Sequence, residues 1–244
     1  MTEPGFFSQV AEWFSDPANW SGSFGIPARF VEHVQISAIS LGLAVPVALP
    51  AAMYIGHRRR FEFAVVSIAN LGRAIPSFGI LFLFVILLGI GDEAVIIAMV
   101  LLAVPPILTN AYVGIQGVDA DTLEAARGMG MSEPGVLIRI ELPLAAPVIV
   151  AGLRTAAVQV VATATLAAVV GGGGFGRFIT DGFAAGDRPQ VFAGAVLVAL
   201  LAIATELAFA LLQRVVTPRT MSRQLVEELI PRRRPVGADV GPVA

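Results

Sequence analysis

The chain has 244 residues, of which 56% are hydrophobic and only 14% are charged, with a formal net charge of −2. A soluble domain carries about 25% charged residues, so this composition predicts an integral membrane protein of one domain. The absence of cysteine excludes disulfides and zinc–thiolate sites, and the absence of lysine excludes ATP hydrolysis through a P-loop of the G-x4-G-K-[ST] type.

Residues 1–30 predict an arm outside the cytoplasm. The arm contains Trp13 and Trp20 among acids and glycines, and its first basic residue is Arg29. It therefore lacks the positive region of a cleaved signal peptide. Two interpretations stay open: the aromatic side chains lie at the outer membrane–water interface, or the arm is loosely ordered.

Five apolar runs follow, each long enough to cross a bilayer, which needs roughly 20 mostly apolar residues. They cover about residues 34–55, 63–89, 94–113, 145–170 and 191–213. We expect an all-α membrane protein with five spans in a transmembrane domain over residues 31–215. An odd number of spans places the two chain ends on opposite sides of the membrane.

The charges between the runs predict the orientation, because basic residues gather in cytoplasmic loops. Residues 57–60 (His-Arg-Arg-Arg) predict a cytoplasmic loop, whereas residues 89–93 carry only acids and predict an outer loop. The N-terminus should then lie outside, and an Arg-rich, partly disordered tail at 216–244 should be cytoplasmic. A break at Pro76 into two shorter helices would change this topology and contradict the arginine distribution, so we expect only a kink there.

A cytoplasmic loop over residues 118–143 is expected to contain a short helix. Asp121 can cap this helix with Glu124 at the third position, and Gly128 and Gly130 can end it. Residues 132–134 (Ser-Glu-Pro) are typical of the start of another helix, which Pro143 would interrupt or redirect. A short helix between two turns suits a groove on another protein, although an ordinary helical loop would also fit this pattern.

The loop also contains the pattern E-A-A-x3-G-x9-I-x-L-P, which resembles the cytoplasmic loop of the membrane subunits of bacterial ABC importers of type I. Its fixed positions are Glu124, Ala125, Ala126, Gly130, Ile140, Leu142 and Pro143. Residues 162–168 (ATATLAA) and 171–176 (GGGGFG) resemble the osmoprotectant branch of that family, which imports glycine betaine, carnitine or choline.

This resemblance implies a permease subunit in the bacterial plasma (inner) membrane. It implies a cytoplasmic ABC ATPase dimer, a second permease chain, identical or homologous, and an extracytoplasmic substrate-binding protein as partners. ATP and magnesium would bind to the ATPase, so we expect no cofactor, no metal, no catalytic residue and no nucleic-acid partner for this chain. Glu124, Ala125, Ala126 and Gly130 would form the coupling helix that docks into the ATPase.

Charged residues within the apolar runs need partners, because burying a charge in a bilayer is unfavourable. Arg73, Arg154 and Glu206 lie at similar expected depths, so we predict that Glu206 pairs with Arg154 or Arg73. Such a pair could be a static contact or a gate.

Thr155, Gln159 and Thr163 are spaced four residues apart and share one helix face. They are predicted to line the translocation pathway, and hydrogen bonds to neighbouring helices are the alternative. An aromatic cage for a quaternary ammonium is expected on the binding protein rather than here.

Other functions fit the sequence less well. Residues 171–176 formally match G-x-G-x-x-G, but a helix precedes them, which favours a tight turn over a dinucleotide site. An importer for methionine or another small polar solute is the nearest alternative. A secondary transporter would need its own ion site, for which Glu206 is the only expected buried carboxylate.

Overall fold

The computed structural model describes residues 5–217, apart from the side chain of Arg73, and this part of the chain is helical throughout its regular structure. The predicted tail at 216–244 lies almost entirely outside the described residues. The elements are α1 (Phe6–Ser15), the 3₁₀ turn η1 (Pro17–Trp20), α2 (Ile26–Arg58), α3 (Glu62–Ala74), α4 (Ser77–Leu88), α5 (Asp92–Gln116), α6 (Ala120–Gly128), α7 (Glu133–Val136), the π-helical turn η2 (Leu137–Glu141), α8 (Leu142–Thr163), the 3₁₀ segment η3 (Ala164–Val170), α9 (Gly176–Ala185) and α10 (Arg188–Val216).

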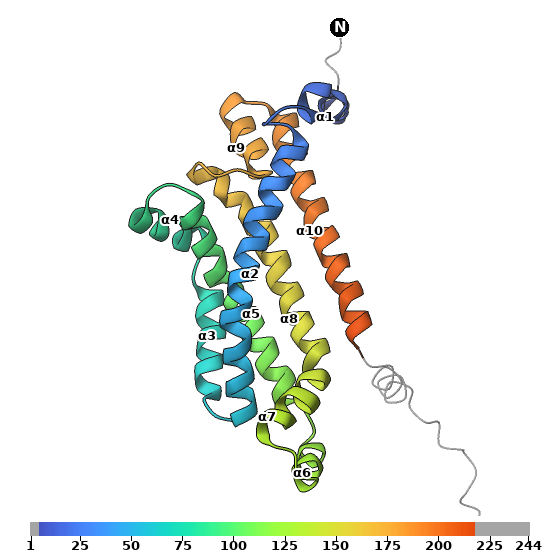
Figure 1. The fold of residues 1–244 in the computed structure, drawn as a ribbon. Helices are drawn as coiled ribbons and strands as arrows, with labels where there is room; N and C mark the ends of the chain where they lie inside the picture. The colour runs from blue at the N-terminus through green and yellow to red at the C-terminus, as the bar shows by residue number, and fades with distance from the viewer. Residues whose placement is uncertain (1–4, 218–244) are drawn as a thin grey trace, which may run out of the picture.

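Four helical stretches in the described residues are long and apolar enough to cross a membrane. They are Ile26–Arg58, Asp92–Gln116, Glu133–Val170 and Arg188–Val216, and each contains one of the runs expected from the sequence. Figure 1 shows these helices side by side, with α6 and α7 at one end of the bundle and α1 and α9 at the other. We refer to these as the α6 end and the α9 end.

The second apolar run is not one kinked helix, as the sequence predicted, but two helices. α3 and α4 meet at an angle of 89° around Ile75 and Pro76. Proline has no backbone N–H and disfavours helical geometry in the residue before it, so both residues adopt extended backbone there. The spans therefore number four, or up to five if the bent pair counts as one. In Figure 1 the chain still ascends from the α6 end through α3 to α4.

The N-terminal arm is helical rather than loosely ordered. The indole of Trp13 is 9% exposed and packs in a cluster with Ile26, Phe175, Phe178 and Ala193. Trp13 and Phe178 meet edge to face with ring centroids 5.4 Å apart, a favourable geometry for aromatic pairs. The arm is thus fixed to the α9 end of the bundle (Figure 1).

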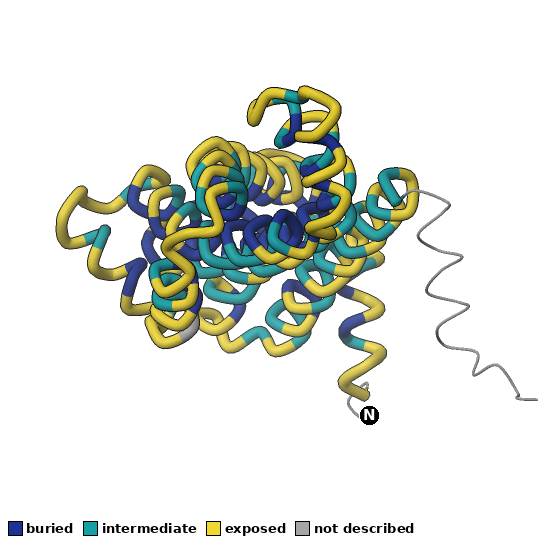
Figure 2. The backbone as a smooth tube through the Cα atoms, turned by 90° about the horizontal axis from the view of Figure 1, so that it is seen from below, coloured by how far each residue is buried: buried dark blue, intermediate teal, exposed yellow. Residues whose placement is uncertain are grey.

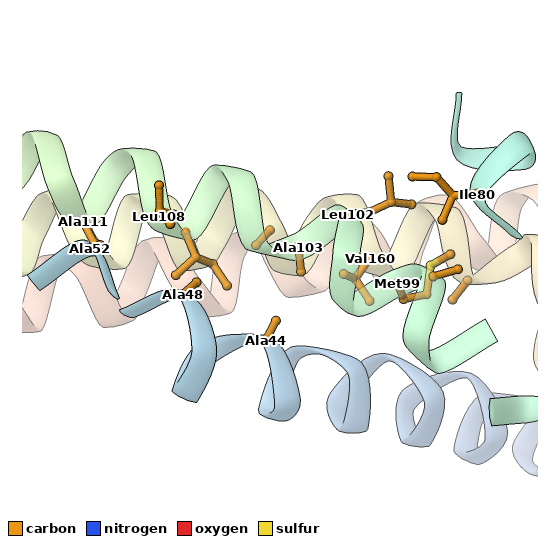
Figure 3. Close-up of a cluster of buried hydrophobic side chains, with 14 of the residues drawn as sticks. Ala44, Ala48, Ala52, Ile80, Met99, Leu102, Ala103, Leu108, Ala111 and Val160 are labelled. Carbon is orange, nitrogen blue, oxygen red and sulfur yellow. The ribbon is translucent and has the colours of Figure 1, made fainter. Parts of the chain in front are cut away.

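Small side chains let the central helices approach closely. Ala44, Ala48 and Ala52 recur every fourth residue of α2, have no exposed surface, and face α5 across the main core (Figure 3). Seen along the bundle, the buried residues gather in its centre and the exposed ones face outward (Figure 2). Because lipid is as apolar as these side chains, close van der Waals packing is what favours association of such helices.

Candidate functional site

The E-A-A segment forms the short helix α6 at the α6 end of the bundle (Figure 1). The helix begins two residues earlier than expected, so its cap is Asp119 and the prediction of Asp121 is wrong. The Asp119 carboxylate accepts hydrogen bonds from the Thr122 N–H at 2.9 Å and from its hydroxyl at 3.0 Å. Glu124 consequently lies beyond the third position and forms no capping box. The Thr122 N–H lowers the pKa of Asp119, because it stabilises the charged carboxylate.

The turn after α6 forms as the glycines predicted. α6 ends at Gly128, and Gly130 has a φ of +85°, which side chains with a Cβ rarely adopt. The next helix begins at Glu133 with Pro134 in its first turn. Pro143 does not interrupt this helix. The π-helical turn η2 precedes it and widens the backbone where the proline ring would otherwise clash with the preceding turn.

The motif contains both exposed and buried positions. Glu124 and Ala125 are exposed, whereas Ala126 is 2% exposed and packs with Val118, Leu123 and Val136 inside the chain itself. The methyl group of Ala126 is covered by the loop's own core, and its part in docking to a partner stays a prediction. Ile140 packs on that small core and Leu142 on the main core, so the two residues join the loop to the bundle.

Four ionisable residues, which sequence reasoning missed as a group, connect the loop to α2. Arg127 donates two hydrogen bonds to Glu133, at 2.9 and 3.2 Å. Glu133 lies 3.1 Å from Nε2 of His57, and Nδ1 of the same ring lies 2.6 Å from Glu141. The only sequence signal was the position of Glu141 within I-x-L-P.

A polar cavity of about 510 Å³ lies between the α3–α4 break, α5 and α8. The three residues predicted for the pathway, Thr155, Gln159 and Thr163, all line it. The remaining lining residues are Ala69, Gly72, Ile75, Ser77, Leu102, Pro105, Pro106, Thr109 and Asn110. None of these described residues is charged. The hydroxyl of Thr109 is buried and has no hydrogen-bond partner within the described residues.

Among the described residues, neither Thr155 nor Thr163 forms a hydrogen bond to a neighbouring helix. The hydroxyl of Thr155 donates to the Ala151 carbonyl at 3.0 Å, and that of Thr163 to the Gln159 carbonyl at 2.7 Å, both within α8. Their hydroxyl oxygens can still accept a hydrogen bond from the cavity side. The described lining residues thus offer a neutral, weakly polar surface.

Arg154 of α8 and Glu206 of α10 form an ion pair. Gln213 extends this contact, because its amide donates to the Pro147 carbonyl at 3.1 Å and its oxygen accepts from Arg154 at 3.4 Å. Arg73 lies in α3, and its side chain is outside the described residues.

At the α9 end, the glycine-rich segment is attached to α2 by two residues that the sequence did not single out. The Gly174 N–H donates to the Glu32 carboxylate at 2.8 Å, and the Phe175 N–H donates to Nδ1 of His33 at 3.2 Å. Nε2 of His33 must then carry the hydrogen that it donates to the Val161 carbonyl at 2.9 Å. A Cβ on Gly173 would lie 2.3 Å from Oε2 of Glu32, so any larger residue there would have to displace this carboxylate. The segment is a turn, as expected.

Comparisons with known proteins agree with the family resemblance. Residues 44–222 match the family model of the binding-protein-dependent transport system inner membrane component. The choline transport system permease protein OpuBB of Bacillus subtilis is 39% identical over 192 residues, which cover 79% of this chain and 88% of that protein. The carnitine transport permease protein OpuCD of Listeria monocytogenes is 33% identical over 211 residues, covering 86% and 94%.

The fold is also that of solved importers. The inward-facing MetNI methionine ABC transporter superposes with a TM-score of 0.69 at 22% identity, covering 83% of this chain and 99% of that one. An amino acid ABC transporter crystallised with histidines gives a TM-score of 0.63 at 18% identity, covering 94% and 100%. At such identities the likeness establishes the fold alone. The matched family model and the identities of the curated relatives show that this chain belongs to the family of binding-protein-dependent transport system inner membrane components.

Proposed function

We propose that this protein is the permease subunit of an ATP-driven importer for quaternary-ammonium osmoprotectants such as choline, glycine betaine or carnitine. The observation that carries the solute assignment is its 33–39% identity to choline and carnitine permeases over most of both chains. The neutral cavity agrees with it, because a charged lining would hold a cationic or zwitterionic solute tightly and slow its release.

In the membrane, α3 and α4 form one broken span, which gives five crossings. The α6 end, with Arg58, Arg59 and Arg60 beside it, lies in the cytoplasm, and α1 and α9 lie outside. The tryptophans of the arm then lie near the outer interface. This orientation places α6 where a cytoplasmic partner can reach it.

The partner proposed for α6 is a separate ABC ATPase dimer, which binds ATP and magnesium and performs the hydrolysis. Glu124 and Ala125 are exposed. Met129 and Ile138, which line a surface groove together with Gly130, are 78% and 60% exposed. An apolar surface next to a charged helix at a cytoplasmic end is typical of a protein-docking surface. A second permease chain, identical or homologous, completes the pathway, and an extracytoplasmic binding protein delivers the solute at the α9 end.

Transport then follows alternating access. ATP-driven closure of the ATPase dimer moves α6, and the two permease chains rotate so that the cavity between α5, α8 and the α3–α4 break opens to one side at a time. ATP and the loaded binding protein act as two ligands that bias one two-state equilibrium. Thr155, Gln159 and Thr163 form the face of α8 along which the solute passes.

The test is solute-stimulated ATP hydrolysis by the complete importer in liposomes, with choline, glycine betaine, carnitine and methionine compared at equal binding-protein saturation. Stimulation by the quaternary amines alone supports the proposal. Stimulation by methionine alone would move the protein to the alternative, an importer for a different small solute, which at present has only the shared fold in its favour.

A further inference from the structure

Four ionisable residues at the α6 end form a continuous series, which we call the His57 chain: Arg127, Glu133, His57 and Glu141. Each member contacts the next through side-chain atoms at 2.6–3.2 Å. The members come from four separate elements: α6, the start of α7, the last turn of α2, and the turn η2. The series therefore runs from the short helix α6 to one of the longest helices of the bundle.

The inner half of the series is held tightly. Glu141 is 1% exposed, and a buried carboxylate is strongly unfavourable unless it is paired. His57 supplies that partner, because its Nδ1 lies 2.6 Å from the Glu141 carboxylate while its Nε2 faces the Glu133 carboxylate at 3.1 Å. His57 and Glu141 thus fix α2 against η2.

The outer half is more accessible. Glu133 has a side chain that is 54% exposed, accepts hydrogen bonds from Arg127 and lies 3.1 Å from Nε2 of His57. The buried apolar residues of α6, Leu123 and Ala126, pack in a small core with Val118 and Val136. Polar contacts through Glu133 therefore make a direct connection between α6 and the last turn of α2.

Resting on the proposed function of α6, we propose that His57 is a positioning residue through which movement of the coupling helix reaches the first long helix. When α6 is displaced, Arg127 moves Glu133, Glu133 moves the imidazole, and α2 follows because His57 is also fixed to Glu141. Glu141, which lies between Ile140 and Leu142 in the motif, then provides the buried anchor of this series.

The experiment uses the complete importer in liposomes and measures solute molecules imported per ATP hydrolysed. His57→Gln and Arg127→Gln are each expected to lower this ratio about fivefold or more, the lower end of typical coupling between sites. Because the two residues act in series, the double variant should be no worse than the more severe single variant. Independent, merely structural effects would multiply instead. Arg60→Gln, an exposed basic residue beside the same end of α2, is the matched control and should leave the ratio unchanged.

Unchanged ratios in both single variants, or multiplied losses in the double variant, would overturn the proposal. If His57→Gln fails to assemble, Glu133→Gln decides, because this exposed side chain connects the two halves and its replacement strands no buried charge. Glu124→Arg separates this inference from the proposed function. If that variant uncouples the importer while the His57 chain variants do not, only the inference fails.

Discussion

Gly152 provides a sensitive test of the packing around the cavity. A Cβ added at Gly152 would lie 2.5 Å from Cβ of Asn110 and 3.0 Å from the Pro106 carbonyl oxygen. Neither atom is the free end of a flexible side chain, so Gly152→Ala must push α5 and α8 apart. Overpacking of this kind typically lowers the free energy of unfolding by about 1–3 kcal/mol.

Gly42→Ala is the matched control, because Gly42 lies within α2 and an added Cβ there would meet no atom within 4 Å. Both variants gain about 0.5–1 kcal/mol from replacing glycine within a helix. The difference between them isolates the overpacking term, and Gly152→Ala should be less stable than Gly42→Ala by about 1–3 kcal/mol.

The assay is reversible unfolding by SDS in mixed micelles, followed by circular dichroism, with solute import measured in parallel. Gly152→Ala should also slow import, because α5 and α8 both line the cavity. Equal free energies of unfolding for the two variants would refute the close approach of these helices. Normal import by a destabilised Gly152→Ala would refute the link between this packing and the pathway.

Three further predictions concern single side chains. Gln159→Leu should reduce solute import while ATPase assembly is kept, because it removes the only amide on the α8 face of the described cavity lining; unchanged import would exclude a pathway role. Asp119→Ala should accelerate amide hydrogen exchange in α6. Because the pKa of Asp119 is lowered in the folded state, its stabilising contribution is present above the pKa of the unfolded chain and lost as pH falls through the folded pKa, so wild-type exchange protection should approach that of the variant in acid. Glu206→Gln leaves Arg154 without its ionic partner and should lower both thermal stability and yield of the assembled complex; unchanged assembly and import would show that the pair neither packs nor gates.

The sequence predicted the helical composition well, because apolar runs of membrane length leave few alternatives. It failed at Pro76, where one apolar run over 63–89 became two helices. Hydropathy reports whether a segment is apolar and not its direction, so a sharp bend inside an apolar run is invisible to it. The identity of the arm as a packed helix was also open, since its stability depends on contacts between Trp13 and residues far along the chain, such as Phe178.

The candidate site was also predicted only in part, because local spacing specifies some of its features and not others. Helical spacing was sufficient to place Thr155, Gln159 and Thr163 on one face, and the structure adds the cavity that they line. Local spacing could not separate Asp119 from Asp121 as the cap. Both are aspartates and can cap a helix equally well, so the residue at which the helix begins decides between them. The pairing of His57 with Glu141 joins residues 84 positions apart, and no local pattern specifies such a contact.

The measurement that tests the central claim most directly is co-purification of this chain with its ATPase, with and without Glu124→Arg, followed by ATP hydrolysis with the loaded binding protein. The account predicts that the wild-type complex forms and is stimulated, and that the charge reversal on the exposed face of α6 weakens the complex or abolishes stimulation. A wild-type chain that binds no ATPase, or a Glu124→Arg variant that couples as well as the wild type, would contradict the assignment of α6 as the coupling helix.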